Sequence, residues 1–287
     1  MVEQDQVPQP IRWPAEAVWQ AVEPLLPGFT IEIVPSIDST NTELMRRARN
    51  GRQEPILLVA EQQTAGRGRL GRPWRSAVGD SLMFSLGLPL APVDWSGLSL
   101  AVGIAVAQSL QPVLPATGSA TPRIGLKWPN DLWLTGDHKL AGILVETASF
   151  IAPGDHGAVA SGHFYQNQAE RYVVIGIGTN VRAPQGDGLS TVPGSLQMID
   201  QRWDAPQALL AMVPPLVGML QTFARQGFAP LVASFAERDA LAGRAVNLSD
   251  GTSGIAQGVA ADGALLVQTA AGVVQVTSSE ISVRPQA

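Results

Sequence analysis

The sequence contains no cysteine among its 287 residues. It therefore offers no disulfide, no thiolate metal site and no cysteine nucleophile. Charge is also sparse: 15% of the residues are charged and 45% are hydrophobic, so the chain can bury a substantial core. Long apolar runs are missing too. The longest, residues 98 to 110, is interrupted by Ser99, Gly103 and Gln108 and is too short to span a bilayer.

The start of the sequence has neither the basic residues nor the apolar run of a secretory signal. This predicts a soluble, cytoplasmic protein with no membrane partner. The net charge of -5 argues against a general nucleic-acid binder, because such domains are usually basic overall or on one broad face. The stretch before residue 30 is too short for a helix-turn-helix domain, so we expect no DNA binding.

Positive charge is concentrated in one loop, residues 62 to 76, which combines three glycines with the arginines Arg67, Arg69, Arg72 and Arg75. Backbone N–H groups beside guanidinium groups suit a phosphate or adenylate ligand, and glycine allows close approach. The loop has no GxxxxGK[ST] pattern, and no helix signal follows it, so it is neither a Walker loop nor a dinucleotide fingerprint. Taken alone, it is equally typical of a solvated turn or an RG-type nucleic-acid contact.

Alternating and β-branched residues predict strands at residues 30–37, 55–61, 81–88, 139–147 and 171–181, with a strand, proline turn and strand at 125–134. Helices are predicted at residues 14–26, 97–111 and 228–240, and on both sides of Pro214 and Pro215 within 206–226. Another helix follows residue 39, where Thr40 and Glu43 stand at capping-box spacing and Gly51 can end the helix. Residues 150–168 read as a loop.

After Gly243 the sequence consists of short β-rich runs separated by DGTSG, ADG and AAG, which predicts a small β-barrel. We therefore expect an α/β fold, with an α+β mixed sheet over residues 1–240 and a barrel over residues 241–287. Residues 1–28 would form an N-terminal tail and a short helix.

Three further motifs each have an ordinary structural explanation. The triplet STN at residues 39–41 suits a helix cap. KWPND at residues 127–131 suits a strand and turn with a buried tryptophan, and GIGTN at residues 176–180 suits a tightly packed strand end. Their order along the chain, together with the arginine loop, is much harder to explain by structure alone.

The ordered set STN, EQQTAGRGRLGRPW, KWPNDLWL, KLAGILVE and GIGTNV closely resembles the biotin–protein ligases, from about Ile33 to the C-terminus. The resemblance implies a mixed sheet shared with lipoate–protein ligases, followed by an SH3-like barrel. It implies that biotin, ATP and Mg²⁺ give biotinyl-5′-adenylate and pyrophosphate. Biotin would then pass to a lysine of the biotin carboxyl carrier protein of acetyl-CoA carboxylase. The short N-terminal region points to the enzyme-only type.

The resemblance also implies roles for particular residues. Biotin would be bound by Ser39, Thr40, Asn41 and Gln63. The carboxylate or the adenylate would be contacted by the loop residues Gly66, Arg67, Gly68, Arg69 and Trp74, by Lys127 and Gly142, and by Asn130, Lys139 and Asn180. We expect Lys127, Arg67 and Arg69 to be catalytic, because two anions must meet when a carboxylate attacks a phosphate. No metal ligand can be assigned: Asp131 is a candidate that can equally anchor its turn, and His156 and His163 read as solvated loop residues.

Three alternatives remain at this point. A lipoate–protein ligase would share the fold, but the sequence has no RRxxGGGxVxHD-type segment. A non-enzymatic nucleic-acid binder would use the arginine loop and would bind less tightly as salt increases. A catalytically inactive ligase could act as a biotin sensor. Both a monomer and a homodimer are compatible with the sequence.

Overall fold

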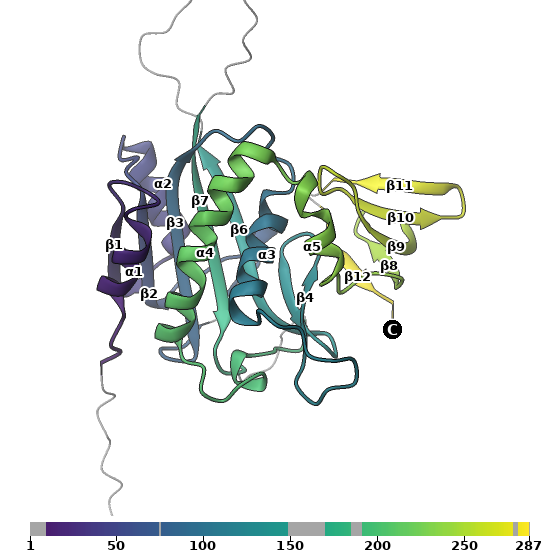
Figure 1. Cartoon of the computed structure of the whole chain (residues 1–287), viewed down its shortest axis with the longest axis horizontal. Coiled ribbons are helices and arrows are strands. Elements are labelled where there is room, and N and C mark those ends of the chain that lie inside the picture. Colours follow the sequence, from purple (N-terminus) through teal and green to yellow (C-terminus); the bar gives the residue numbers. More distant parts are fainter. Residues whose placement is uncertain (1–9, 75, 149–169, 185–190, 278–280, 287) are drawn as a thin grey trace, which may run out of the picture.

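The computed structural model describes residues 10–74, 76–148, 170–184, 191–277 and 281–286 (Figure 1). Its larger part is built on a seven-stranded sheet in the order β1-β2-β3-β7-β6-β5-β4. Strand β1 runs parallel to β2, and every other neighbouring pair is antiparallel. The strands are β1 (Thr30–Ile37), β2 (Ile56–Gln63), β3 (Ser81–Leu90), β4 (Ile124–Lys127), β5 (Asp131–Leu134), β6 (His138–Ala148) and β7 (Arg171–Asn180).

Helices cover both faces of this sheet (Figure 1). The helices α1 (Ala15–Val22), α3 (Leu98–Leu110) and α4 (Ala205–Gln226) pack on the face that carries Leu57, Val173 and Ile175. Helix α2 (Thr40–Arg49) packs on the face that carries Leu58 and Val174. Successive strand residues point to opposite faces, so these apolar runs supply both cores at once.

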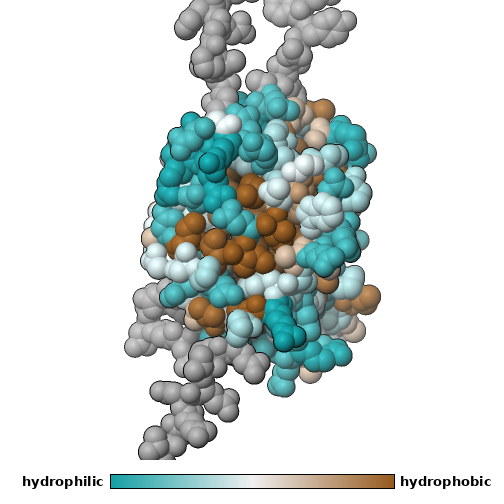
Figure 2. All heavy atoms as spheres, turned by 90° about the vertical axis from the view of Figure 1, so that its left-hand side faces the viewer, coloured by the Kyte–Doolittle hydropathy of each residue, from teal (hydrophilic) through white to brown (hydrophobic). Residues whose placement is uncertain are grey.

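Strand β1 forms one edge of the sheet, and Figure 2 views the molecule from that side. Apolar side chains gather near the middle of this view, between hydrophilic flanks. Pro35 lies within β1, where it removes one backbone donor from the exposed edge. Because this donor is missing, the exposed edge of β1 is less able to pair with a strand of another molecule.

A second sheet of five antiparallel strands follows, in the order β11-β10-β9-β8-β12. Its strands are β8 (Ala245–Leu248), β9 (Ser253–Val259), β10 (Leu265–Thr269), β11 (Gly272–Val276) and β12 (Val283–Pro285). This C-terminal module docks beside β4. The buried Trp128 Nε1 donates to the Gly263 carbonyl of the module at 3.0 Å, and the Leu126 N–H donates at 2.6 Å to the carbonyl of Arg238, in the segment that leads into the module.

The expected strands of both sheets are present, and the mixed α/β class is confirmed. The helix cap was placed one residue too late. The structure has Ser39 as the N-cap of α2, with its hydroxyl accepting from the Thr42 N–H, and Thr40 is already helical. The Thr40 side chain is instead used in contacts with Gln63 and Ser85. Glu43 pairs with Arg46 and Arg47 rather than closing a capping box.

The helix predicted on both sides of Pro214 and Pro215 is present, and one other helix prediction needs correction. Helix α4 is continuous through Pro214 and Pro215, because its buried face packs against the core. Pro214 has no N–H to donate to the carbonyl of Leu210, but Leu210 lies on the exposed face of the helix. By length and composition α4 could cross a membrane, but Leu209, Met212 and Leu216 are fully buried in the core. Residues 228–240 do not form one helix. A 3-10 turn, Ala229–Leu231, precedes the short helix α5 (Val232–Ala236), and the chain then leaves the helix to pair with β4.

The predicted loop at residues 150–168, with His156 and His163, lies outside the described residues.

Candidate functional site

A cavity of about 970 Å³ opens where the arginine loop, the ends of β6 and β7, the KWPND turn and residues 281–286 of the C-terminal module meet. This volume is in the range of small-molecule sites. Every site residue predicted from the sequence lines the cavity except Gly66. Gly66 is instead needed inside the loop, since a Cβ at this position would lie 2.9 Å from the Trp74 carbonyl oxygen.

The triplet at the start of α2 forms a buried polar network. Gln63 Oε1 accepts from the Thr40 N–H at 2.7 Å and lies 3.2 Å from the Thr40 hydroxyl. Ser85 Oγ, on β3, lies 2.7 Å from Thr40 Oγ1 and 2.6 Å from Asn41 Oδ1. Ser39, Thr40, Asn41 and Ser85 are all buried. The network therefore presents fixed polar groups to the cavity from a rigid strand and helix.

Asn41 is held from three sides. Its Nδ2 donates to the Leu144 carbonyl at 3.2 Å and to Glu146 Oε2 at 2.9 Å, while its Oδ1 accepts from Ser85. Exchanging the amide nitrogen and oxygen would set oxygen against oxygen at Glu146 and Leu144, so these contacts fix the orientation of the amide. The group sits directly over Gly176, where a Cβ would lie 2.1 Å from Asn41 Oδ1.

The arginine loop folds back on itself as a narrow turn. The Gly68 N–H donates to the Arg72 carbonyl, and the Trp74 N–H donates to the Gly66 carbonyl, both at 2.8 Å. Leu70 at the tip has a left-handed φ of 57° and is 57% exposed. The Trp74 ring rests on Gly178, where a Cβ would lie 2.6 Å from the ring, and also faces Gly142 at 3.4 Å. The two glycines thus provide the flat floor on which this indole lies.

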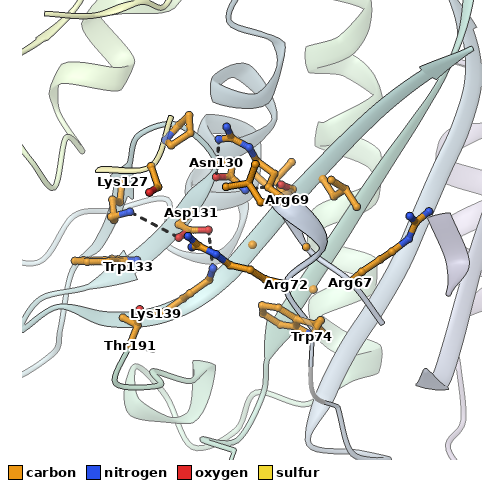
Figure 3. Close-up of a pocket in the computed structure, with 18 of the residues that line it drawn as sticks. Arg67, Arg69, Arg72, Trp74, Lys127, Asn130, Asp131, Trp133, Lys139 and Thr191 are labelled. Carbon is orange, nitrogen blue, oxygen red and sulfur yellow. Dashed lines mark hydrogen bonds and ion pairs between the residues drawn. The ribbon is translucent and has the colours of Figure 1, made fainter. Parts of the chain in front are cut away.

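Cationic side chains gather around Asp131 (Figure 3). Lys139 Nζ lies 2.8 Å from Asp131 Oδ1, and Lys127 Nζ lies 3.9 Å from Asp131 Oδ2 and 4.9 Å from the centre of the Trp133 ring. Burial lowers the pKa of Lys127 to about 8, partly opposed by Asp131, with Lys139, Arg72 and Arg69 adding to the lowering. The described side chains of this cation cluster (Arg69, Arg72, Lys127 and Lys139 around Asp131) leave an excess of positive charge, which suits an anionic ligand.

Arg69 reaches this cluster through Asn130. Its Nη1 donates to Asn130 Oδ1 at 3.2 Å, and Asn130 Nδ2 donates to the Ile143 carbonyl at 2.7 Å. Burial lowers the pKa of the Arg69 guanidinium. Asn180 is likewise tied into the scaffold, because its Nδ2 donates to the carbonyls of Lys139 and Gly194.

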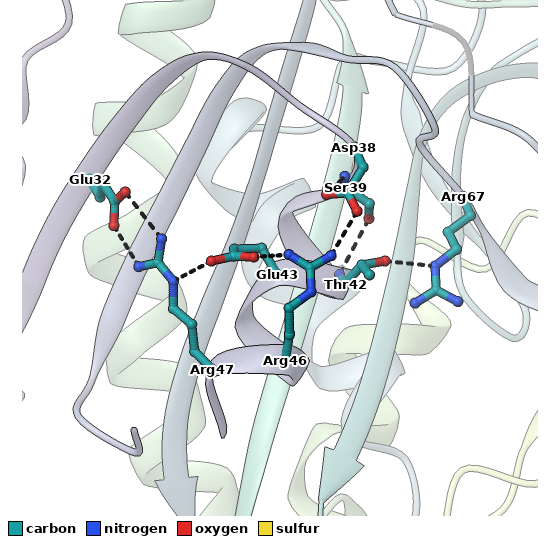
Figure 4. A network of polar contacts seen from close by, with 8 residues as sticks. All are labelled: Glu32, Asp38, Ser39, Thr42, Glu43, Arg46, Arg47 and Arg67. Atoms are coloured by element: carbon teal, nitrogen blue, oxygen red, sulfur yellow. Dashed lines mark hydrogen bonds and ion pairs between the residues drawn. The ribbon is translucent and has the colours of Figure 1, made fainter. Parts of the chain in front are cut away.

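Arg67 points away from the cation cluster (Figure 3). Its Nε donates to Thr42 Oγ1 at 3.1 Å, and its Nη2 lies 3.6 Å from Glu146 Oε1. Figure 4 shows this arginine beside an ion-pair network on α2, in which Arg47 bridges Glu32 and Glu43. The structure therefore separates Arg67 from Arg69 and Lys127, which had been grouped as one catalytic set.

Three residues of the site carried no signal that the sequence analysis used for a ligand role: Ser85, Glu146 and Asp137. Ser85 is flanked by apolar residues on both sides in β3, and Glu146 follows the apolar run of β6, which was the available sign of them. Across the described residues, no group of three or more His, Asp or Glu side chains could hold a metal ion.

Comparison with known proteins fits this geometry. The sequence profile described as the Biotin/lipoate A/B protein ligase family matches residues 33–162, and the profile described as the Biotin protein ligase C terminal domain matches residues 242–284. The bifunctional ligase/repressor BirA of Escherichia coli is 32% identical over 266 residues, covering 90% of this chain and 75% of that protein. The chain belongs to the biotin protein ligase family.

Other members of the biotin protein ligase family agree. The biotin–[acetyl-CoA-carboxylase] ligase of Mycobacterium tuberculosis is 37% identical over 160 residues, which cover 54% of this chain and 51% of that protein. A biotin protein ligase from Aquifex aeolicus, solved in complex with biotin and ATP, superposes with a TM-score of 0.69 at 25% identity. That match covers 89% of this chain and 99% of the Aquifex chain. The biotin protein ligase fold therefore extends over nearly the whole described molecule.

Proposed function

We propose that this protein is a biotin–protein ligase that joins biotin and ATP to biotinyl-5′-adenylate and then transfers biotin to a lysine of a carrier protein. The observation that carries the proposal is the division of one cavity into two chemically different parts. The triplet network offers neutral, fixed hydrogen-bonding groups, and the cation cluster offers positive charge. A biotin protein ligase relative was solved with both biotin and ATP, which supports this assignment.

Biotin would occupy the part of the cavity formed by Ser39, Thr40, Asn41 and Gln63. A ureido ring is polar on its edge, so burial requires hydrogen-bond partners, and the oriented amide of Asn41 and the hydroxyls supply them. We assign the glycines Gly142, Gly176 and Gly178 to the floor of this part. They leave room for Asn41 and Trp74 above the sheet.

The reaction needs a carboxylate to approach a phosphate, and both are anions. Lys127, Lys139 and Arg69 would offset this repulsion and stabilise the charge that develops on the phosphate. Asn130 holds Arg69, and Arg67 would hold the loop against α2 and contact the carboxylate end. The remaining gain would come from alignment of the two substrates, so no side-chain nucleophile is required.

Magnesium would enter with ATP as part of the substrate. The carboxylate of the cation cluster, Asp131, is paired with Lys139 at 2.8 Å, so the described residues do not form a metal site by themselves. When bound, the ion supplies further charge neutralisation on the phosphates.

We further propose the carrier protein of acetyl-CoA carboxylase as the acceptor, because the Mycobacterium relative is named a biotin–[acetyl-CoA-carboxylase] ligase. The working division is a catalytic part over residues 1–240 and a C-terminal module over residues 241–287. The cytoplasm is the expected compartment.

ATP–pyrophosphate exchange tests the proposal directly. The purified full chain is assayed with MgATP and labelled pyrophosphate, with biotin, with lipoate and with neither acid. We expect exchange that depends on biotin. Exchange with lipoate alone would assign the chain to the related ligase reaction, and no exchange with either acid would refute acid activation.

A further inference from the structure

A bidentate ion pair joins the C-terminal module to the mouth of the cavity. Arg244 Nη1 donates to Asp137 Oδ1 and Nη2 donates to Oδ2, both at 2.7 Å. Arg244 precedes the first strand of the module, and Asp137 lies in the turn between β5 and β6. Both residues line the cavity. Parallel N–H···O bonds of this kind fix direction as well as distance.

The turn that carries Asp137 belongs to the hairpin that carries the cation cluster. Strand β5 begins with Asp131, and strand β6 contains Lys139 directly after the turn. The turn is tight, with left-handed φ values of 90° at Gly136 and 65° at Asp137. The position of Asp137 is therefore closely coupled to the positions of both strands of the hairpin.

Asp137 is also a negative charge close to a site that needs positive charge. The hydrogen bonds from Arg244 keep the pKa of Asp137 below its ordinary value, and Lys127 adds to this lowering. The carboxylate is thus ionised and within electrostatic reach of Lys127. Without Arg244, its charge would counteract part of the field that the cation cluster presents to an anion.

Other contacts hold the module in place without this pair. Trp128 Nε1 donates to the Gly263 carbonyl in the buried interface, and Gly263 packs closely against Gly97. Leu126 forms backbone hydrogen bonds with Arg238 and Ala240, in the segment that leads into the module. The side chains of Arg244 and Asp137 remain 35% and 47% exposed. An exposed ion pair contributes little to the free energy of folding. The importance of this pair therefore lies in its position at the cavity.

We infer that Arg244 is a positioning residue: it pins the β5–β6 hairpin to the C-terminal module and neutralises Asp137, so that the cation cluster is aligned for the phosphates of the nucleotide. The inference rests on the proposed function for the identity of that nucleotide. It does not require Arg244 to touch any substrate.

The test measures binding of MgATP, of pyrophosphate and of biotin by calorimetry, together with the melting temperature, on the full chain. For Arg244→Ala we expect about a ten-fold weaker Kd for MgATP and for pyrophosphate, since a carboxylate is left unpaired beside the anion site. Biotin affinity and melting temperature should stay close to those of the wild type. The matched control is Arg202→Ala, because Arg202 pairs with Asp200 at 2.6 Å on the surface and does not line the cavity.

The charge-reversed protein Asp137→Arg/Arg244→Asp should recover most of the lost affinity. Asp137→Asn/Arg244→Ala, which removes the unpaired carboxylate, should bind MgATP more tightly than Arg244→Ala alone. An Arg244→Ala protein with unchanged MgATP affinity would overturn the inference, as would equal weakening of biotin and MgATP with a lower melting temperature. A wild-type protein that binds pyrophosphate but not biotin would instead refute the proposed function and leave the positioning role standing.

Discussion

At the scale of single residues, Lys127 combines burial with a functional demand for charge. Its pKa is lowered from 10.5 to about 8 because burial disfavours the cation and three neighbouring cations add repulsion. The group is charged below that pH and neutral above it. A lysine of ordinary pKa would stay charged across the whole physiological range, so this shift makes the site sensitive to mild alkali.

The first prediction follows from the direction of this shift. In ATP–pyrophosphate exchange, kcat/KM for MgATP should fall as the pH rises through about 8, because the free enzyme loses the Lys127 cation. Lys127→Arg should retain part of the activity and move the fall to higher pH, since arginine stays protonated. A wild-type profile that is flat up to pH 9.5 would contradict this role.

The second prediction concerns Gly176, which lies beneath Asn41. In Gly176→Ala the new Cβ would lie 2.1 Å from Asn41 Oδ1, so the amide must leave its place. We expect biotin affinity to fall about ten-fold or more, because the contacts of Asn41 to Ser85 and Glu146 are lost together. MgATP affinity should change little. Gly218→Ala is the control, since a Cβ there meets nothing within 4 Å and α4 should gain from alanine.

The residues of the candidate site were only partly predictable from the sequence. STN, KWPND and the arginine loop stand out because several unusual residues are adjacent. Ser85 and Glu146 each adjoin apolar strand residues, and their partner Asn41 lies 44 and 105 positions away in the chain. No local pattern reports such pairs, because the sheet register decides which strand residues meet the helix.

At the scale of elements, the arginine loop is tied at its base and exposed at its tip. Its base is fixed by the Gly66–Trp74 hydrogen bond and by backbone bonds from Thr64 and Ala65 to the end of β1. Leu70 at the tip keeps a left-handed backbone that costs a leucine some energy. We therefore expect the tip of the loop to change conformation while its base stays fixed beside the triplet.

The third prediction tests this property by limited proteolysis. Trypsin should cut the free protein after Arg67 or Arg69, and saturating biotin with MgATP should slow these cuts several-fold by ordering the loop over the ligand. Cleavage elsewhere, for example after the exposed Arg202, should keep its rate. Equal rates at all sites with and without ligands would show that the loop does not close.

Element boundaries were predictable where local signals agreed with the tertiary structure. Gly51, with a φ of 83°, follows the end of α2 as expected. The predictions failed where packing decided the outcome. The sequence position of Thr40 suits a helix cap, but β2 and β3 place Gln63 and Ser85 beside its hydroxyl, which contacts them instead. Residues 228–240 have helical spacing, yet Arg238 and Ala240 pair with Leu126 of β4.

At the scale of the whole molecule, one tryptophan couples the two sheets. Trp128 is 1% exposed and donates to Gly263, whose own position is tight, since a Cβ there would lie 2.9 Å from the Gly97 Cα. The sequence predicted a buried tryptophan and a separate module, but it contained no sign of which residues would meet. Local sequence patterns describe each module separately, so they do not indicate which residues of the two surfaces will be in contact.

The fourth prediction concerns the stability of this junction. Trp128→Phe should lower the free energy of unfolding by about 1–3 kcal/mol, because the buried Gly263 carbonyl loses its donor and part of the ring volume is lost. Urea denaturation followed by circular dichroism measures the change. In Trp133→Phe the lost Nε1 has no hydrogen-bond partner among the described residues, so the cost should be smaller. A larger loss for Trp133→Phe would contradict the importance of the hydrogen bond.

The cation cluster has a consequence for the protein before any substrate arrives. Arg69, Arg72, Lys127 and Lys139 repel one another across Asp131, so the unliganded fold carries an unfavourable energy that any suitable anion relieves. Phosphate or sulfate in a buffer should therefore raise the melting temperature and, by the same occupancy, compete with ATP. Thermal stability and apparent nucleotide affinity should move in opposite directions as the concentration of such a salt increases.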